Sequence, residues 1–355
     1  MRRIAAVVTS RISPAASSCF PSPLAAYAES VYDIDIDSEQ RLLYRDLLRK
    51  SSQAEPTQSS TPSEELTPPP RPQQLSSTVD TSSSRPLSDE SSTFVWRNGG
   101  LAEEAANSVV YDTARSMALG ALGVIINVYM RGFNSFTMWG ADKLENAVRE
   151  RDHAVPLLTV SNHVSAGDDP LMLAPLLPLH LWFDGQSVKW TFCASNRCFT
   201  SPALSRMFSF LKILPLYRNV GLEESGLGAG LERLQRGDWI HIFPEGTRNT
   251  TSEKSLHRCR PGVGFLIAES PECPIVIPMV HSGMEGILPK GASGLKTGNE
   301  VFVLVGDPLD FRDRLAYHRE NGTPKVVIYQ DIAARVGVEL VRLKQELRMK
   351  IMAMK

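Results

Sequence analysis

From about residue 100 onward, the chain alternates short apolar runs with longer stretches of helical spacing. The apolar runs lie at 157–160, 239–243, 275–280 and 301–305. Stretches in which apolar residues recur with helical spacing lie between them, at 202–213, 222–235 and 262–270. Apolar runs of this length are typical of buried strands, and strands that alternate with helices favour a parallel sheet. The pattern therefore predicts an α/β domain with a mainly parallel central sheet flanked by helices.

The last stretch of the chain has an apolar residue at every third or fourth position. Between Lys325 and Met354 these residues are Ile328, Ile332, Val336, Leu340, Leu343, Leu347 and Ile351. This spacing predicts one amphipathic helix. Its apolar face is expected to pack on the domain. Contact with a membrane surface is the alternative, supported only by the basic residues near the end.

The most apolar run of the chain, SMALGALGVIINVYM, occupies 116–130. A helix that crosses a bilayer needs roughly 20 apolar residues, and this run is shorter. Asp112 and Arg115 precede it, and Arg131 follows it. We therefore expect a membrane-associated helix that enters one leaflet or lies at the interface. A buried core helix is the alternative.

The first hundred residues differ from the rest in composition. Residues 1–28 contain arginine, serine and alanine but no acidic residue until Glu29, which is typical of an organellar transit peptide. Mitochondrion and plastid cannot be told apart by this rule. Residues 29–99 are expected to form a low-complexity, disordered linker with one short helix at 37–50, because 51–93 is dominated by Ser, Thr, Pro and Gln. The domain then occupies 100–355.

Charge and cysteine content narrow the possible partners. The net charge is −1, which gives no field that would indicate nucleic acid. The five cysteines are Cys19, Cys193, Cys198, Cys259 and Cys273. They form no matched CxxC pairs, so neither a zinc site nor a disulfide is predicted and all are expected to be reduced thiols.

A histidine and a carboxylate follow the first predicted strand, in the segment SNHVSAGDDP at 161–170. His163 leaves a buried strand, so it is expected at the sheet edge where α/β folds bind ligands. Asp168 can fold back and accept a hydrogen bond from one imidazole nitrogen, which leaves the other nitrogen free as a base. Such a pair can deprotonate a substrate hydroxyl. The same spacing also fits a structural histidine capped by an aspartate.

A turn that contains glycine and arginine follows the second predicted strand, in the segment FPEGTRN at 243–249. Gly246 allows a close approach of the backbone. The planar guanidinium of Arg248 matches a phosphate. A second cation, Arg218, ends the segment LPLYR at 214–218. Each segment taken alone also fits a solvated turn.

In this order and spacing, NHxxxxD followed by FPEGTR resembles the glycerolipid acyltransferase superfamily. The stretches PLLTVSNHVSAGDDP, GDWIHIFPEG, GVGFLIAE and IVIPMVHSGMEGILP are similar to the tafazzin family within it. The resemblance runs from about residue 108 to about residue 310. It implies acyl transfer to a lysophospholipid hydroxyl, with tafazzin-like remodelling of (monolyso)cardiolipin at a mitochondrial membrane as the expected reaction.

The resemblance also implies roles for individual residues. His163 and Asp168 are expected to be the catalytic pair. The residues expected to bind the substrate are Glu245, Gly246, Thr247, Arg248 and Arg218. His241 and His281, in or beside apolar strands, are expected to be satisfied core histidines. No metal and no resident cofactor are expected, because the acyl donor is itself a substrate. The expected partners are membrane phospholipids and lysophospholipids.

One departure from the family pattern concerns the acyl donor. Tafazzins of animals and fungi usually carry lysine after FPEG, whereas this chain continues with Thr247 and Arg248, a form typical of acyl-CoA-dependent relatives. Two alternatives therefore stay open. One is an acyl-CoA-dependent lysophospholipid acyltransferase of broader headgroup range, lysophosphatidylethanolamine included. The other is a non-catalytic protein that only binds lipid at the membrane interface.

Overall fold

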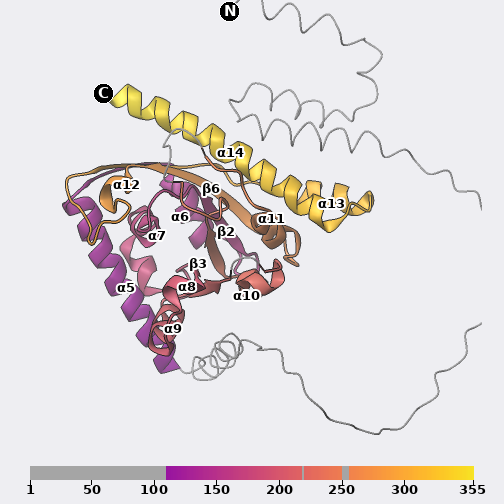
Figure 1. Cartoon of the computed structure of the whole chain (residues 1–355), viewed down its shortest axis with the longest axis horizontal. Coiled ribbons are helices and arrows are strands. Elements are labelled where there is room, and N and C mark those ends of the chain that lie inside the picture. Colours follow the sequence, from indigo (N-terminus) through magenta and orange to yellow (C-terminus); the bar gives the residue numbers. More distant parts are fainter. Residues whose placement is uncertain (1–108, 218–219, 250–255) are drawn as a thin grey trace, which may run out of the picture. The chain divides into compact units, whose positions relative to one another are not determined.

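The computed structural model of the chain describes residues 109–217, 220–249 and 256–355 (Figure 1). Its centre is a seven-stranded sheet in the order β1-β7-β6-β2-β5-β3-β4. The strands are β1 (Ser135–Trp139), β2 (Leu157–Ser161), β3 (Trp190–Ala194), β4 (Ile213–Leu216), β5 (Trp239–Ile242), β6 (Ile275–Ser282) and β7 (Glu300–Val305). Every neighbouring pair is parallel except β6 with β7, which is antiparallel. The predicted α/β class with a mainly parallel sheet is confirmed.

The apolar runs did not predict three of the strands, β1, β3 and β4. β1 and β4 form the two edges of the sheet and are only partly buried, and β1 mixes polar and apolar residues. β4 also contains Pro215, which an edge strand tolerates. The helix expected over 202–213 ends at Phe210. The chain then turns at Lys212, whose φ of 61° is left-handed, and enters β4.

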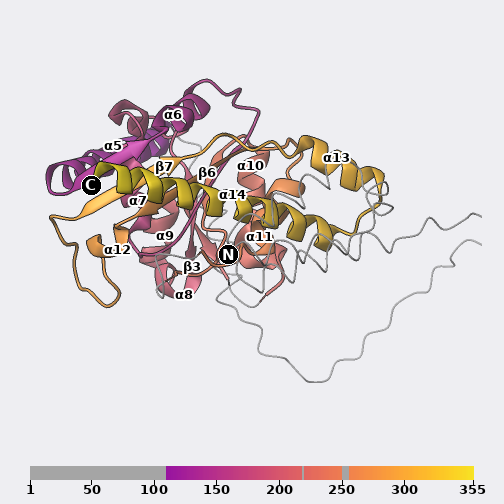
Figure 2. The same ribbon diagram turned by 90° about the horizontal axis from the view of Figure 1, so that it is seen from above.

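Helices cover both faces of the sheet (Figures 1 and 2). The α-helices are α5 (Val109–Gly132), α6 (Ala141–Arg149), α7 (Asp168–Leu171), α8 (Ser195–Cys198), α9 (Pro202–Phe210), α10 (Gly228–Gln235), α11 (Pro261–Ala268), α12 (Met284–Ile287), α13 (Arg312–Glu320) and α14 (Lys325–Met354). Shorter turns of helix are η2 (Ala174–Leu176), η3 (Leu179–Phe183) and η4 (Glu223–Leu227).

Successive side chains of the central strands point into two separate cores. Leu158 and Val160 of β2 belong to the core under α10, α11 and α14. Leu157 of the same strand belongs to the core under α5 and α6. Because side chains alternate along a strand, a strand buried on both faces feeds both cores. This burial fixes the register of β2, whose carboxyl end carries the candidate chemistry.

The predicted amphipathic helix is α14, a single helix of 30 residues. Five residues of its predicted face are at most 1% exposed: Ile332, Val336, Leu340, Leu343 and Leu347. A Cβ added at Gly264 of α11 would lie 2.0 Å from the backbone oxygen of Tyr329, so the two helices are in close contact. The predicted packing of this face on the domain is confirmed.

The apolar run at 116–130 lies within α5, which is longer than the run itself and has 24 residues. One side of α5 packs on the domain, where Gly123 lies against the ring of Trp182. The other side exposes apolar residues, among them Ile125 and Val128 at 65% and 57%. In the described part of the chain, α5 alone is long and apolar enough to cross a membrane, a property that core helices share. α5 is therefore only partly buried in the described part of the chain, and its association with a membrane stays a prediction.

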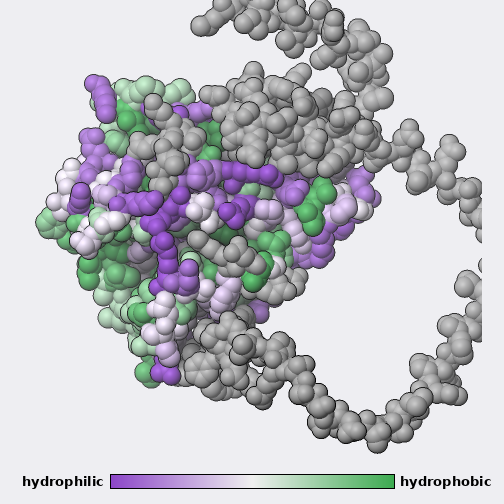
Figure 3. Space-filling view, viewed as in Figure 1, coloured by the Kyte–Doolittle hydropathy of each residue, from purple (hydrophilic) through white to green (hydrophobic). Residues whose placement is uncertain are grey.

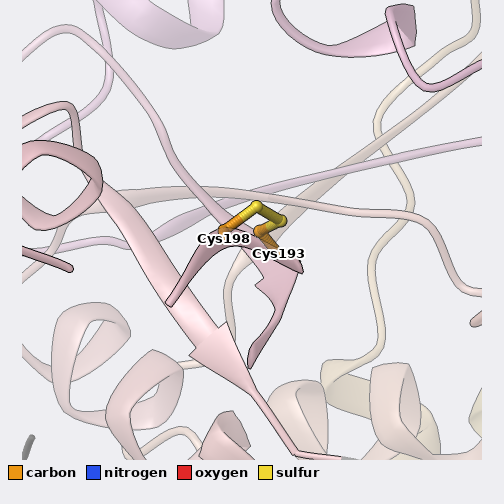
Figure 4. The surroundings of a disulfide bond; sticks show 2 residues. All are labelled: Cys193 and Cys198. Carbon is orange, nitrogen blue, oxygen red and sulfur yellow. A yellow bond between two sulfur atoms is a disulfide. The ribbon is translucent and has the colours of Figure 1, made fainter. Parts of the chain in front are cut away.

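The expectation of reduced thiols is wrong for two of the cysteines. Cys193 at the end of β3 and Cys198 at the end of α8 form a disulfide (Figure 4). The single turn of α8 reverses the chain and brings the two Cα atoms to 6.1 Å, within the range that a disulfide bridges. A search for CxxC pairs could not detect this turn. Cys259 and Cys273 are free thiols.

Several predictions concern residues outside the described ranges. They are the transit peptide at 1–28, the linker at 29–99 with its helix at 37–50, the thiol of Cys19, and Arg218. These stay predictions, as does the division of the chain into domains.

Candidate active site

The imidazole of His163 and the carboxylate of Asp168 meet just beyond the end of β2. His163 lies two residues after β2, and Asp168 is the first residue of α7. Nδ1 of His163 and Oδ2 of Asp168 are 2.9 Å apart. An ionised carboxylate only accepts hydrogen bonds, so Nδ1 carries the proton and Nε2 keeps a free lone pair. The His163 side chain is 20% exposed and Asp168 is fully buried, so only the histidine can meet a substrate.

The surroundings of Asp168 favour its ionised form. Oδ2 also accepts hydrogen bonds from the backbone N–H groups of Val164 at 2.7 Å and Ser165 at 2.9 Å. Burial alone would raise the pKa of Asp168. The neighbouring imidazoles of His281 and His163, together with the Ser165 N–H, outweigh burial and hold the pKa below its usual range. The carboxylate can therefore stabilise positive charge on His163.

The backbone of His163 is held by the FPEGTRN turn that follows β5. Its N–H donates to Oε1 of Glu245 at 2.9 Å, and its C=O accepts from the N–H of Asn249 at 2.7 Å. The ring stacks on Phe243, with centroids 4.0 Å apart and planes at 16°. Because β2 and β5 are adjacent parallel strands, their carboxyl ends bring the two motifs into one site.

Glu245 turns its carboxyl group inward, toward backbone amides. Oε2 accepts from the N–H of His257 at 2.8 Å, and the whole residue is 2% exposed. Burial raises the pKa of Glu245 to about 7, against the opposing effects of the His257 and His163 amides and the charge of Lys344. The structure thus gives Glu245 a supporting contact with His163. Its predicted contact with substrate stays a prediction.

The rest of the turn carries the cation Arg248. A second cation, Arg260, lies against the turn at Gly246. Gly246 has φ of 67°, Thr247 is exposed, and Arg248 is partly buried. Arg260 lies against Gly246, where an added Cβ would be 2.6 Å from its Cδ, and its Nε donates to the backbone oxygen of Glu245 at 3.2 Å. Arg260 was not predicted from the sequence, because only the fold brings the start of α11 to this turn.

Asp169, the second residue of α7, forms a buried ion pair with Lys189. Nζ of Lys189 donates to Oδ2 of Asp169 at 2.6 Å, and both side chains are 6% exposed. Burial alone would raise the pKa of Asp169, but the charge of Lys189 lowers it below its usual range. The pair ties the residue after Asp168 to the segment just before β3.

The two buried histidines of the central strands, His241 and His281, differ in their relation to the site. His241 is satisfied, as predicted, by hydroxyl groups of Thr159 at 2.9 Å and Ser161 at 3.3 Å. Burial lowers its pKa to about 3, so the ring is neutral. His281 is equally buried, but its Nε2 lies 3.7 Å from Oδ2 of Asp168. The sequence did not predict that His281 lies near Asp168, because a single histidine in an apolar strand has the pattern of any core residue.

Comparisons with known proteins agree with this geometry. A family model described as Acyltransferase matches residues 141–282, which include both motifs. The chain is 33% identical over 208 residues to a tafazzin of Drosophila melanogaster, covering 58% of this chain and 54% of that protein. It is 35% identical over 184 residues to N-acylphosphatidylethanolamine synthase of Arabidopsis thaliana, covering 50% and 64%. A tafazzin of Saccharomyces cerevisiae is 28% identical over 235 residues, covering 54% and 61%.

The sheet, the two joined motifs and the matched family model define an acyltransferase domain of the glycerolipid acyltransferase superfamily. Within that class, the chain is similar to proteins named tafazzin. These relatives confirm the resemblance to the tafazzin family that is seen in the sequence. The aligned segments span between 54% and 64% of the length of these relatives.

Glu245 is expected to make the stability of the domain depend on pH. Its pKa is about 7 in the folded chain against an ordinary value of 4.5, so the folded state keeps a proton that the unfolded state has released. This stabilisation is complete below pH 4.5 and disappears as the pH rises through 7, a loss of about 3 kcal/mol. Glu245→Gln lacks this titration. Thermal unfolding at about pH 5 and about pH 8 should show the parent losing stability relative to Glu245→Gln. A difference that does not change with pH would contradict this result.

Proposed function

We propose that the chain is a membrane-bound phospholipid acyltransferase that moves a fatty acyl chain to the hydroxyl of a lysophospholipid. The observation that carries the proposal is the pairing of a partly exposed His163 with a buried, ionised Asp168 inside an acyltransferase domain. Such a pair supplies a base at a position that a substrate hydroxyl can reach. The relatives named tafazzin and N-acylphosphatidylethanolamine synthase support the same reaction class.

In the proposed reaction, Nε2 of His163 takes the proton of the acceptor hydroxyl as its oxygen attacks the acyl carbonyl. The imidazolium that forms is stabilised by Asp168 through Nδ1. The tetrahedral intermediate then collapses, the bond from the carbonyl carbon to the donor breaks, and His163 returns the proton to the leaving group. The acyl chain passes directly from donor to acceptor. No resident metal or cofactor takes part, and the acyl donor is a second substrate.

Arg248 is proposed to hold the lipid phosphate. It lies between Glu245 and Asn249 in the turn that holds His163, so a phosphate bound there would place the lipid near the base. A guanidinium binds a phosphate in a planar, two-pronged contact. Arg260, which lies against Gly246, adds a second guanidinium at this turn. Arg218 is proposed as a further cation for the headgroup.

Two reactions are compatible with this site. Remodelling of (monolyso)cardiolipin is favoured by the relatives named tafazzin. Acyl-CoA-dependent acylation of other lysophospholipids is favoured by Thr247 and Arg248 after FPEG. The relative named N-acylphosphatidylethanolamine synthase supports phospholipid acyl transfer with a headgroup other than that of cardiolipin. A mitochondrial membrane is the proposed location, with a plastid as the runner-up, on the composition of residues 1–28.

An assay of acyl transfer distinguishes these reactions and tests the base. Purified protein is mixed with phospholipid vesicles that contain labelled monolysocardiolipin or another lysophospholipid, with and without acyl-CoA, and products are followed by mass spectrometry. Transfer without acyl-CoA supports cardiolipin remodelling, and transfer only with acyl-CoA supports the second reaction. His163→Ala should lower kcat by about 10²- to 10⁴-fold, the usual range for loss of a general base.

The control is His153→Ala. His153 is exposed and lies before β2, at the opposite end of that strand from His163. It should keep the activity of the parent. Equal activity in His163→Ala would remove that residue from the mechanism. Lipid binding without turnover in the parent would favour a protein that only binds lipid.

The same protein is proposed to contact the membrane through an apolar surface on one side of the domain. Figure 3 shows apolar atoms over the side where Figure 1 places α5. α5 packs on η3, and its Tyr111 contacts Phe210 of α9 with ring centroids 5.3 Å apart. Exposed apolar residues on these three elements are Val109, Val110, Met117, Ile125, Val128, Leu179, Phe183, Leu204 and Met207. An apolar surface at this position would hold the site close to its lipid substrates.

Charges on α5 should weaken membrane binding. The double variant Ile125→Glu with Val128→Glu should bind phospholipid vesicles at least about tenfold more weakly in a sedimentation assay, because charged side chains are costly to bury in lipid. Val326→Glu is the control, since Val326 is 62% exposed on α14. Equal binding by the double variant and the control would exclude α5 from the contact.

A further inference from the structure

Asn162, the residue before His163, is bound three times to His281 of β6. The Asn162 side chain accepts a hydrogen bond from the backbone N–H of His281 at 2.9 Å. It donates one to the backbone C=O of His281 at 3.2 Å. In return, Nε2 of His281 lies 2.8 Å from the backbone oxygen of Asn162. A carbonyl only accepts hydrogen bonds, so this nitrogen carries the proton. The last residues paired between β2 and β6 are Ser161 and Met279, so these bonds extend the contact of the two strands beyond their ladder.

Lys344 of α14 adds a charge to this contact. Its Nζ donates to the C=O of His281 at 2.6 Å, and the residue is 5% exposed. Removing an ammonium group from water is costly, so a lysine is rarely buried to this extent unless it is paired with another group. The charge of Lys344 also lowers the pKa of Glu245, whose carboxyl group supports the N–H of His163. The long C-terminal helix therefore reaches the back of the candidate site.

His281 lies behind the carboxylate as well. Its Nε2 is 3.7 Å from Oδ2 of Asp168, the oxygen that orients His163. The protonated Nε2 thus directs a partial positive charge toward that oxygen while it binds the oxygen of Asn162. One imidazole contacts the residue before His163 and faces the carboxylate that binds its ring.

We propose that His281 and Lys344 are positioning residues, which fix Asn162 to β6 and α14 and thereby hold His163 in line with Asp168. They do not contact the substrate. The inference rests on the proposed role of His163 as the base. It assigns to the C-terminal helix a part in catalysis in addition to its part in the core.

The charge on α14 is tested by Lys344→Met, which keeps the length of the side chain and removes its ammonium group. We expect kcat to fall about ten- to a hundredfold, since small displacements of a catalytic group have effects of this size, and KM to stay within about twofold. The matched control is Lys212→Met. Lys212 is 4% exposed and donates to the C=O of Val188 at 2.7 Å. This contact lies just before the amino ends of β3 and β4, whereas the site lies at the carboxyl ends of β2 and β5.

The imidazole is tested by a pair of substitutions at His281. His281→Leu removes the Nε2 donor and should lower kcat to a similar extent. His281→Gln places an amide nitrogen near the lost Nε2 and should recover most of that kcat. The control is His318→Leu, because His318 is 7% exposed and binds Asp331 at 2.8 Å between α13 and α14.

Hydrogen exchange measured by mass spectrometry gives a readout that does not need turnover. Peptides that cover residues 157–171 should exchange faster in Lys344→Met and His281→Leu than in the two controls, at equal melting temperature. Faster exchange in these two variants, together with no acyl transfer by the parent, would retain the positioning contact and reject the proposed function. Unchanged exchange, with kcat no lower than in the controls, would overturn the positioning role while the proposed function stands. Failure of His281→Gln to exceed His281→Leu in kcat would exclude the imidazole donor.

Discussion

The backbone of His163 is held on both sides by a turn that is remote in the sequence, and the candidate site depends on this contact. Glu245 accepts the N–H of His163, and Asn249 donates to its C=O. Asp168 can orient the ring only if the backbone keeps this position. The two contacts exist because β2 and β5 are neighbours in the sheet and end at the same edge. Their register is fixed in turn by the two cores that bury β2 on both faces.

Buried charge is concentrated around this contact. Asp168 is ionised with four donors or imidazoles near it, and Asp169 is ionised against Lys189. Glu245, by contrast, lies in surroundings that raise its pKa to about 7. Two adjacent carboxylates are therefore kept charged, while the pKa of the third lies near neutral pH. Such separation of carboxyl pKa values is typical of sites that transfer protons.

The sequence predicted what depends on local spacing. The His163–Asp168 contact spans one turn, and the apolar face of α14 follows from helical periodicity, so both could be recognised without the fold. The support of His163 by Glu245 could not be predicted, since it needs β5 beside β2. His281 gave no sequence signal for the same reason, as an imidazole in an apolar strand has the pattern of any core residue. The edge strand β4 was missed because it contains Pro215 and because the expected helix at 202–213 reached its first residue.

The most direct test of the central claim is a double-mutant cycle on the catalytic pair. kcat/KM is measured for the parent, His163→Ala, Asp168→Asn and the double variant, with the melting temperature of each. If Asp168 acts through His163, the double variant should be no slower than His163→Ala, because nothing is left for Asp168 to orient. Losses that multiply in the double variant would show that the two residues act independently, and would contradict the pair as the site's base.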